Sequence, residues 1–195
     1  MHGELGGGCT VGPFAVVARS ATVGSRCVLG AGVVVGEGAS LGDGCVLHPH
    51  AVIGDDVVLG EGVEVLHSAV VGRMPGGARA TARAPRKVKR LTIGSGCAIG
   101  AHATIYYDVE VGEETLIGDG ASIREGGRIG ARCIVSRCVT LNYDVTIEDG
   151  AKVMDNTHLT GGTFIARDAF ISTMVASAND NQPTTELGDR VLSGP

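Results

Sequence analysis

The sequence is poor in aromatic residues, which make up only 3% of its 195 residues, and it contains no tryptophan. Aromatic side chains usually supply much of the buried area of a globular core. Their scarcity, beside 44% apolar residues overall, indicates a thin interior of aliphatic and small side chains. Proline is also scarce, with 6 residues, whereas glycine reaches 32, far above ordinary usage. Such an excess requires either a regular repeat or disorder.

The chain also lacks an excess of positive charge and a long apolar run. Its net charge of -5 gives no global attraction to nucleic acid or to an anionic membrane, so we expect neither as a partner. No apolar stretch approaches the roughly 18 residues of a membrane span. Met1 is followed by His2, Gly3 and Glu4 rather than by a basic start and an apolar stretch, so no secretory signal is predicted. We therefore expect a cytoplasmic protein with reduced cysteines.

A six-residue repeat accounts for both the glycine and the missing aromatics. Steps of six from Leu5 to Val71, and again from Ile93 to Ile171, give 26 positions, and all of them are Leu, Ile or Val. The fifth residue of each hexad is Ala, Cys, Gly, Thr or Val in 25 of 26 cases, with Pro75 as the exception. Disorder does not produce such a pattern, and a short fixed period is typical of a solenoid.

Each hexad is predicted to form a short strand and a turn, with its first and fifth side chains directed inward. Glycine at the second position is expected to let the chain turn where a side chain would be strained. Three hexads would make one coil, so that residues 18 apart stack at about 4.8 Å, the spacing of paired strands. The prediction is an all-β, single-stranded parallel β-helix forming one domain over 1–195. It divides into coils 5–72, a basic loop 73–92, coils 93–176 and an irregular tail 177–195.

The cysteines fit this arrangement. Cys9, Cys27 and Cys45 are 18 residues apart, Cys97 and Cys133 are 36 apart, and all five occupy the small inward position. We interpret them as core residues rather than metal ligands, since no C-x-x-C pair is present. The sixth cysteine, Cys138, occupies a fourth position and is expected to face solvent. No metal is predicted.

The first break in the repeat is the segment 73–92. It holds seven of the sixteen basic residues and no acidic residue, and its prolines and glycines oppose regular structure. We predict a loop that leaves one corner of a coil. It is either a solvated excursion or an arm that meets phosphate groups, because loops of this length are often functional.

The second break is the loss of second-position glycine, which falls from 9 of 12 hexads before the loop to 5 of 14 after it. One column of the later coils has no glycine and reads Tyr106, Arg124, Asn142, Thr160. A groove beside this column would be the natural ligand site, although the same edge could pack against another subunit. The sequence thus predicts a polar and aromatic strip at one corner that includes Arg124, Glu125, Asn142, Tyr143, Asp144 and His158.

His158 is the leading candidate for a general base, since it lies beside the strip with Asp155 and Asn156 close in sequence. A neutral imidazole can accept a proton from an attacking amine or hydroxyl. His102 is a second candidate, and a reaction without a protein base is a third possibility. No Ser/His/Asp or Cys/His arrangement is evident, so direct transfer between two bound substrates is favoured over covalent catalysis.

The early histidines form a separate group. His48 and His50 flank Pro49, and His67 occupies the matching corner of the next coil. These three could bind a metal ion, but we expect them to lack a supporting carboxylate, which argues against a metal site.

The hexads resemble those of the hexapeptide-repeat acyltransferases, whose β-helix is left-handed, and we predict that hand from the resemblance. The stretch from Ile99 to Asn181 is similar, more specifically, to bacterial N-acetyltransferases that act on nucleotide-linked amino sugars. The strings that carry the resemblance are IYYDV at 105–109, IGDGASIRE at 117–125, NYDV at 142–145 and DNTH at 155–158.

The resemblance implies a homotrimer with sites in clefts between neighbouring helices, and acetyl-CoA as the donor. It implies that His158 is the base for transfer of an acetyl group to an amine, or a hydroxyl, of a nucleotide-linked sugar. Ser172 and Thr173 would hold the pantetheine arm of the donor. The residues predicted to orient the acceptor are Arg124, Glu125, Asn142, Tyr143, Asp155 and Asn156.

Two other functions remain open at this point. A γ-type carbonic anhydrase with zinc between subunits requires a His pair five residues apart with a third His upstream, and this sequence has no such pair. A non-catalytic scaffold is the second alternative. A purely structural helix, however, has no need of a polar strip confined to one corner.

Overall fold

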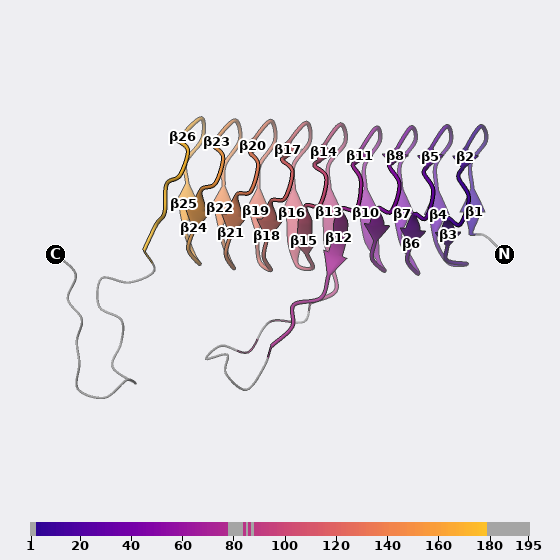
Figure 1. Cartoon of the computed structure of the whole chain (residues 1–195), viewed down its shortest axis with the longest axis horizontal. Coiled ribbons are helices and arrows are strands. Elements are labelled where there is room, and N and C mark those ends of the chain that lie inside the picture. Colours follow the sequence, from indigo (N-terminus) through magenta and orange to yellow (C-terminus); the bar gives the residue numbers. More distant parts are fainter. Residues whose placement is uncertain (1–2, 78–83, 85, 87, 179–195) are drawn as a thin grey trace.

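The computed structural model describes residues 3–77, 84, 86 and 88–178. These residues form 26 short strands and no helix, so no described helix is available to cross a membrane. The chain winds into a stack of coils along one axis (Figure 1). Three parallel sheets run the length of the stack, and consecutive strands of the chain belong to sheets A, B and C in turn. The predicted parallel β-helix is confirmed, and the arrangement is consistent with the left-handed form.

The strands are two to four residues long, as expected when each hexad supplies one strand and one turn. Sheet A contains β1 (Glu4–Leu5), β4 (Thr22–Val23), β7 (Ser40–Leu41), β10 (Val57–Leu59), β13 (Leu91–Ile93), β16 (Val109–Val111), β19 (Arg128–Ile129), β22 (Thr146–Ile147) and β25 (Phe164–Ile165). Sheet B contains β2 (Thr10–Val11), β5 (Val28–Leu29), β8 (Val46–Leu47), β11 (Glu64–Val65), β14 (Ala98–Ile99), β17 (Leu116–Ile117), β20 (Ile134–Val135), β23 (Lys152–Val153) and β26 (Phe170–Ile171). Sheet C contains β3 (Val16–Val17), β6 (Val34–Val35), β9 (Val52–Ile53), β12 (Val70–Arg73), β15 (Thr104–Tyr106), β18 (Ser122–Ile123), β21 (Thr140–Leu141) and β24 (His158–Leu159).

The core is the narrow interior between the three sheets, and it is built as the repeat predicts. The aliphatic first residues and the small fifth residues are buried through most of the stack. Cys27, Cys45, Cys97 and Cys133 are buried and Cys138 is exposed, as expected, whereas Cys9 in the first coil is only half-buried. Burial raises the pKa of the Cys45 thiol to about 11. These thiols therefore stay protonated and serve as packing groups, in agreement with the interpretation from sequence.

The role predicted for the second-position glycines requires a correction. Fourteen non-glycine residues take a positive φ, and all of them occupy the fourth position of a hexad, as does Gly62. The left-handed turn therefore falls two residues later than predicted. Second-position glycines are needed for close approach instead: a Cβ on Gly60 would lie 2.5 Å from the backbone nitrogen of Ser95 in the next coil. Stacked coils leave no room for a side chain directed along the stack at these points.

The predicted loop leaves the stack between β12 and β13, so its strand boundaries are Arg73 and Leu91 (Figure 1). Across it, Leu59 pairs with Ile93, 34 residues away rather than 18. The coils above and below the loop therefore stay in register. Most of the predicted tail, residues 179–195, lies outside the described residues; just before it, Ala176 forms an isolated bridge with His158 of β24.

Candidate functional site

The outward face of sheet C changes character at the loop. Before the loop its outward column is valine throughout, and after the loop the column is polar. The register places Val70 of β12 directly against Thr104 of β15, which marks the change. The column runs Val16, Val34, Val52, Val70, Thr104, Ser122, Thr140, His158. Since outward side chains contribute little to the core, the polar half is available for other roles.

His158 lies at the end of this polar column on β24, and its side chain is exposed. Its Nδ1 atom shares a hydrogen bond of 2.6 Å with Thr140 Oγ1 on the neighbouring strand. The described residues form no hydrogen bond with its Nε2 atom. One ring nitrogen is thus held by the protein while the other faces outward, which is the arrangement a general base requires.

The strip predicted from the missing glycines lies at the C–A corner, which we define as the turns 106–108, 124–126, 142–144 and 160–162. Arg124 donates from Nη1 to Asn142 Oδ1 at 3.4 Å, so successive coils are in contact there. Arg124 also forms a two-point ion pair with Glu125, at 3.1 Å for each bond. The guanidinium group is therefore held in a defined position at this corner.

Glu125 differs from its predicted role. Its side chain is 0% exposed, and both of its oxygens accept hydrogen bonds from Arg124. A fully buried carboxylate does not reach an acceptor at the surface. Glu125 instead positions Arg124, which is about one-third exposed. The sequence pattern placed the two residues correctly at one corner but did not reveal which of them is buried.

Tyr106 and Tyr107 take opposite roles at the same corner. Tyr106 is flanked by two guanidinium groups, with Arg73 at 5.1 Å and Arg124 at 5.9 Å from its ring centroid. Tyr107 is buried and donates its hydroxyl to the backbone oxygen of Asp55 at 2.7 Å. Tyr107 therefore anchors the base of the loop to the earlier coils, whereas Tyr106 is half-buried within the strip at the C–A corner.

Three described basic residues of the loop, Arg86, Lys89 and Arg90, bind carboxylates of this same protein. Arg86 forms an ion pair with Asp144 at the C–A corner. Lys89 lies 2.9 Å from Asp55, and this contact holds the pKa of Asp55 below its usual range. Arg90 pairs with Glu110 at 2.7 Å. These cations could meet a phosphate group only by leaving their present partners, so the described part of the loop acts as a strap against the corner.

Asp155 and Asn156 lie at the opposite corner of sheet C, which we call the B–C corner and define as the turns 136–138, 154–156 and 172–174. The Asp155 carboxylate accepts hydrogen bonds from Arg137, with Nη2 at 2.6 Å, and from the Ser136 hydroxyl. Arg137 and Ser136 together lower the pKa of Asp155 to about 2. The two residues thus flank His158 from the other side of the sheet, and Asp155 is not directed at the imidazole.

Ser172 and Thr173 follow β26 at the B–C corner, and both side chains are exposed. The backbone oxygen of Ser172 accepts a hydrogen bond of 2.9 Å from Thr157 Oγ1 in the coil before. The predicted donor residues therefore lie one coil beyond Asp155 and Asn156. The structure brings the predicted residues onto a single face, sheet C with its two corners, rather than into one corner as the sequence suggested.

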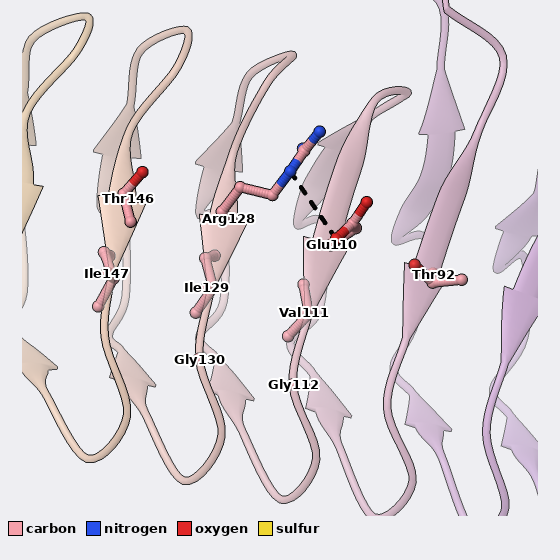
Figure 2. A pocket seen from close by; sticks show the side chains of 9 residues that line it. All are labelled: Thr92, Glu110, Val111, Gly112, Arg128, Ile129, Gly130, Thr146 and Ile147. Carbon is pink, nitrogen blue, oxygen red and sulfur yellow. Dashed lines mark ion pairs between the residues drawn. The ribbon is translucent and has the colours of Figure 1, made fainter. Parts of the chain in front are cut away.

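A groove lies on a neighbouring face. It measures about 430 Å³ and follows the outer surface of sheet A, where Arg128 and Glu110 form an ion pair at 3.8 Å (Figure 2). Its lining contains none of the predicted site residues. It adjoins the C–A corner, because Arg128 also pairs with Asp108 at 3.1 Å. The lining residues are Thr92, Glu110, Val111, Gly112, Arg128, Ile129, Gly130, Thr146 and Ile147.

The early histidines do have a carboxylate beside them, which corrects the expectation from sequence. His48 Nε2 lies 2.7 Å from Glu64 Oε1, and the His48 and His67 rings are 4.9 Å apart. The sequence did not show this, because Glu64 is 16 residues from His48 and meets it only when the coils stack. Within the described ranges, no three His, Cys, Asp or Glu side chains are grouped to hold a metal ion.

Comparison of the chain with known protein families identifies the same six-residue repeat. A family described as bacterial transferase hexapeptide (six repeats) matches residues 2–37 and 38–73, and the hexapeptide repeat of succinyl-transferase matches residues 90–125. Together these matches cover more than half of the chain. The chain belongs to the hexapeptide-repeat transferase family. No curated protein matches it.

Two solved structures illustrate the likeness of this hexapeptide-repeat protein to known folds. The UDP-N-acetylglucosamine acyltransferase of Arabidopsis is 24% identical, with a TM-score of 0.78, over 89% of this chain and 62% of that enzyme. The UDP-N-acetylglucosamine acyltransferase of Campylobacter jejuni is 18% identical, with a TM-score of 0.62, over 81% of this chain and 69% of that enzyme. At these identities the likeness shows the fold. The chain spans 62% of the length of the Arabidopsis enzyme.

Proposed function

We propose that this protein is an acyltransferase that moves an acetyl group from acetyl-CoA to an amine or a hydroxyl of a nucleotide-linked sugar. The family supports a transferase, and the two solved neighbours are named for acylation of a UDP-linked amino sugar. The observation that carries the proposal is His158, whose Nδ1 is held by Thr140 and whose Nε2 faces outward at the end of a polar column. The proposed transfer uses no metal ion.

In this mechanism His158 acts as the general base. Its Nε2 accepts the proton of the attacking N–H or O–H group while that atom forms a bond to the thioester carbonyl carbon. The tetrahedral intermediate then breaks its carbon–sulfur bond, and the imidazolium returns the proton to the departing sulfur of coenzyme A. The acetyl group passes directly between two bound substrates, so the protein gains its rate by holding them in position.

We assign the acceptor to the C–A corner. Arg124 is partly exposed there and is fixed by Glu125, while Asn142 and Tyr143 lie in the next coil. A fixed guanidinium and an amide side chain suit the hydroxyl and phosphate oxygens of a nucleotide-linked sugar. Glu125 would act through Arg124 rather than by contact.

We assign the donor to the B–C corner of the last described coils. Exposed Ser172 and Thr173 would hold the pantetheine arm. Asn156, predicted from the sequence to orient the acceptor, is exposed one coil earlier at this same corner, so we place it on the donor side instead. His158 lies on the strand between the two corners, so the two substrates would meet over sheet C. Asp155 would contribute by fixing this turn, because its carboxylate is bound to Arg137.

The proposal includes a homotrimer in the cytoplasm. Val16 and Val34 are 57% and 39% exposed on sheet C before the loop, and an exposed apolar column of this kind suits packing against a second copy. The polar half of the same sheet would then lie at the mouth of the cleft between two copies.

The test is the change in melting temperature with acetyl-CoA and, separately, with a panel of nucleotide-linked sugars. A ligand at a hundred times its Kd should stabilise the protein by about 2.7 kcal/mol, which a thermal scan detects readily. We expect stabilisation by acetyl-CoA and by at least one sugar of the panel, with free coenzyme A and the matching nucleotide as comparisons. A melting temperature that does not change with any donor or acceptor would favour a non-catalytic scaffold over an enzyme.

A further inference from the structure

We propose that Thr140 is a positioning residue that holds His158 in the tautomer protonated at Nδ1, which leaves Nε2 as the proton acceptor. The inference rests on the proposed function, in which His158 is the base, and it adds the residue that makes the imidazole competent. Its basis is the hydrogen bond of 2.6 Å between Thr140 Oγ1 and His158 Nδ1.

The hydroxyl of Thr140 is held in a fixed place. Thr140 is half-buried on β21, and its backbone nitrogen donates to the oxygen of Thr157 at 2.9 Å in the next coil. The coil before also pairs with this strand, since Ser122 lies opposite Thr140. A β-branched side chain on a strand with partners on both sides has few rotamers. Oγ1 therefore offers a rigid reference point for the ring.

The backbone of His158 is equally fixed, so the hydrogen bond decides the direction of the ring. Its nitrogen donates to the oxygen of Val175 at 2.8 Å, and its oxygen accepts from the nitrogen of Ser177 at 3.0 Å. The residue beyond it in the column is Ala176, which offers only a methyl group. The neighbouring position on this side therefore offers no polar side chain, and Thr140 supplies the hydrogen bond to the ring on the other side.

The tautomer matters because a neutral imidazole carries one proton on one of two nitrogens. If Nδ1 carries it and donates to Oγ1, Nε2 has a lone pair for the acceptor proton. If the hydroxyl donates instead, Nε2 carries the proton and cannot act as a base. We take the first arrangement, in which the Thr140 hydroxyl accepts this bond, because it is the one that leaves Nε2 able to serve as the base of the proposed mechanism.

The nearest carboxylate in sequence does not take this role. Asp155 binds Ser136 and Arg137 at the B–C corner. A hydroxyl on a neighbouring coil therefore replaces the acidic group that orients a catalytic histidine in many hydrolases. A neutral partner fixes the tautomer without adding a charge beside the ring.

The experiment compares Thr140→Val, which keeps the branched shape but removes the hydroxyl, with Thr140→Ser, which restores a hydroxyl. Thr22→Val, the same change at the same hexad position on β4 of sheet A, is the matched control. The full chain is labelled with ¹⁵N at histidine, and the two ring nitrogens of His158 are assigned from the spectrum of His158→Gln. Far-ultraviolet circular dichroism and melting temperature show that each variant is folded.

We expect the wild-type spectrum at neutral pH to show a protonated Nδ1 and an unprotonated Nε2. Thr140→Val should move the population toward the Nε2-protonated form and lower kcat about 3- to 10-fold with KM little changed, the size expected of one neutral hydrogen bond. Thr140→Ser should restore both readouts, and Thr22→Val should change neither.

A wild-type His158 protonated at Nε2, or a Thr140→Val spectrum with the tautomer unchanged, would overturn the inference. These outcomes are read from the spectrum and need no activity. Failure of the proposed function would appear differently, as the absence of acetyl transfer by the wild-type protein, while the tautomer of His158 would still decide the role of Thr140.

Discussion

At the scale of single residues, each position of the hexad has its own physical constraint. The first and fifth residues are buried in the core through most of the stack. The fourth has a left-handed backbone conformation, which many residue types adopt here. The second is constrained by contact, since a Cβ there meets the backbone of the next coil. Tyr106, Arg124 and Asn142 occupy second positions without glycine, and their side chains leave the stack at the C–A corner.

Gly60 and Gly62 lie in the same turn but are under different constraints. Gly60 is limited by contact with the next coil, and Gly62 by its left-handed backbone conformation. A Cβ on Gly60 would lie 2.5 Å from the backbone nitrogen of Ser95, whereas nothing lies within 4 Å of one on Gly62, whose φ is +63°. We expect Gly60→Ala to destabilise by about 1–3 kcal/mol through overpacking. Gly62→Ala should cost about 1 kcal/mol for the left-handed conformation. Melting temperatures of the two variants measure the difference, and an equal loss would contradict this division of roles.

At the scale of elements, the turn between β15 and β16 joins the loop to the later coils. Asp108 is buried there, and its carboxylate binds Arg128 at 3.1 Å while its backbone oxygen accepts from Arg128 Nη1 at 2.7 Å. By contrast, Arg90 and Glu110 form an exposed pair. Ion pairs at the surface contribute little, whereas a buried carboxylate without its partner is costly.

Arg128→Met should therefore destabilise the protein by about 3 kcal/mol, because among the described residues it leaves the buried Asp108 charge with Arg86 alone, at 3.9 Å. Arg90→Met removes a similar side chain from an exposed pair and should cost less than about 1 kcal/mol. Chemical denaturation of both variants makes the comparison. Equal costs would show that the Asp108 pair is not a structural anchor of this turn.

The sequence predicts the elements far better than the site. Hexad positions gave the sheets, the core cysteines and the loop because these depend on burial, and burial follows the six-residue period. Contacts between coils depend on stacking instead, as with Glu64 beside His48 and Arg86 beside Asp144, which is 58 residues away. The burial of Glu125 was missed for the same reason. The change from valine to polar residues along sheet C could have been found by sorting the outward residues by coil.

At the scale of the whole molecule, sheet C has an apolar half and a polar half that meet at the loop. Val16 and Val34 of the valine column are exposed in the single chain and Val52 and Val70 are half-buried, whereas the C–A corner on the other side of the loop is polar. An assembly that buries the valines at a subunit interface and leaves the polar half open at a cleft would suit the chemistry of both halves. This links the proposed trimer to the proposed site.

We accordingly expect a mass in solution of three times 19.7 kDa. Val34→Asp places a charge in the valine column and should shift the mass toward that of the monomer, because an unpaired charge is costly at an apolar interface. Val58→Asp on β10 of sheet A, where the valine is also exposed, should leave the mass unchanged. Light scattering after size exclusion measures both. A monomeric mass for the wild-type protein would contradict the proposed trimer.

The most direct test of the central claim is acetyl transfer itself. The full chain is incubated with acetyl-CoA and a nucleotide-linked amino sugar that stabilises it, and acetylated sugar and free coenzyme A are measured by mass. We expect equal amounts of the two products, a fall of about 10²- to 10⁴-fold in rate for His158→Ala, and an unchanged rate for His50→Ala. His102→Ala should also retain activity if His158 is the base. A folded His158→Ala variant that transfers acetyl groups at the wild-type rate would contradict the account.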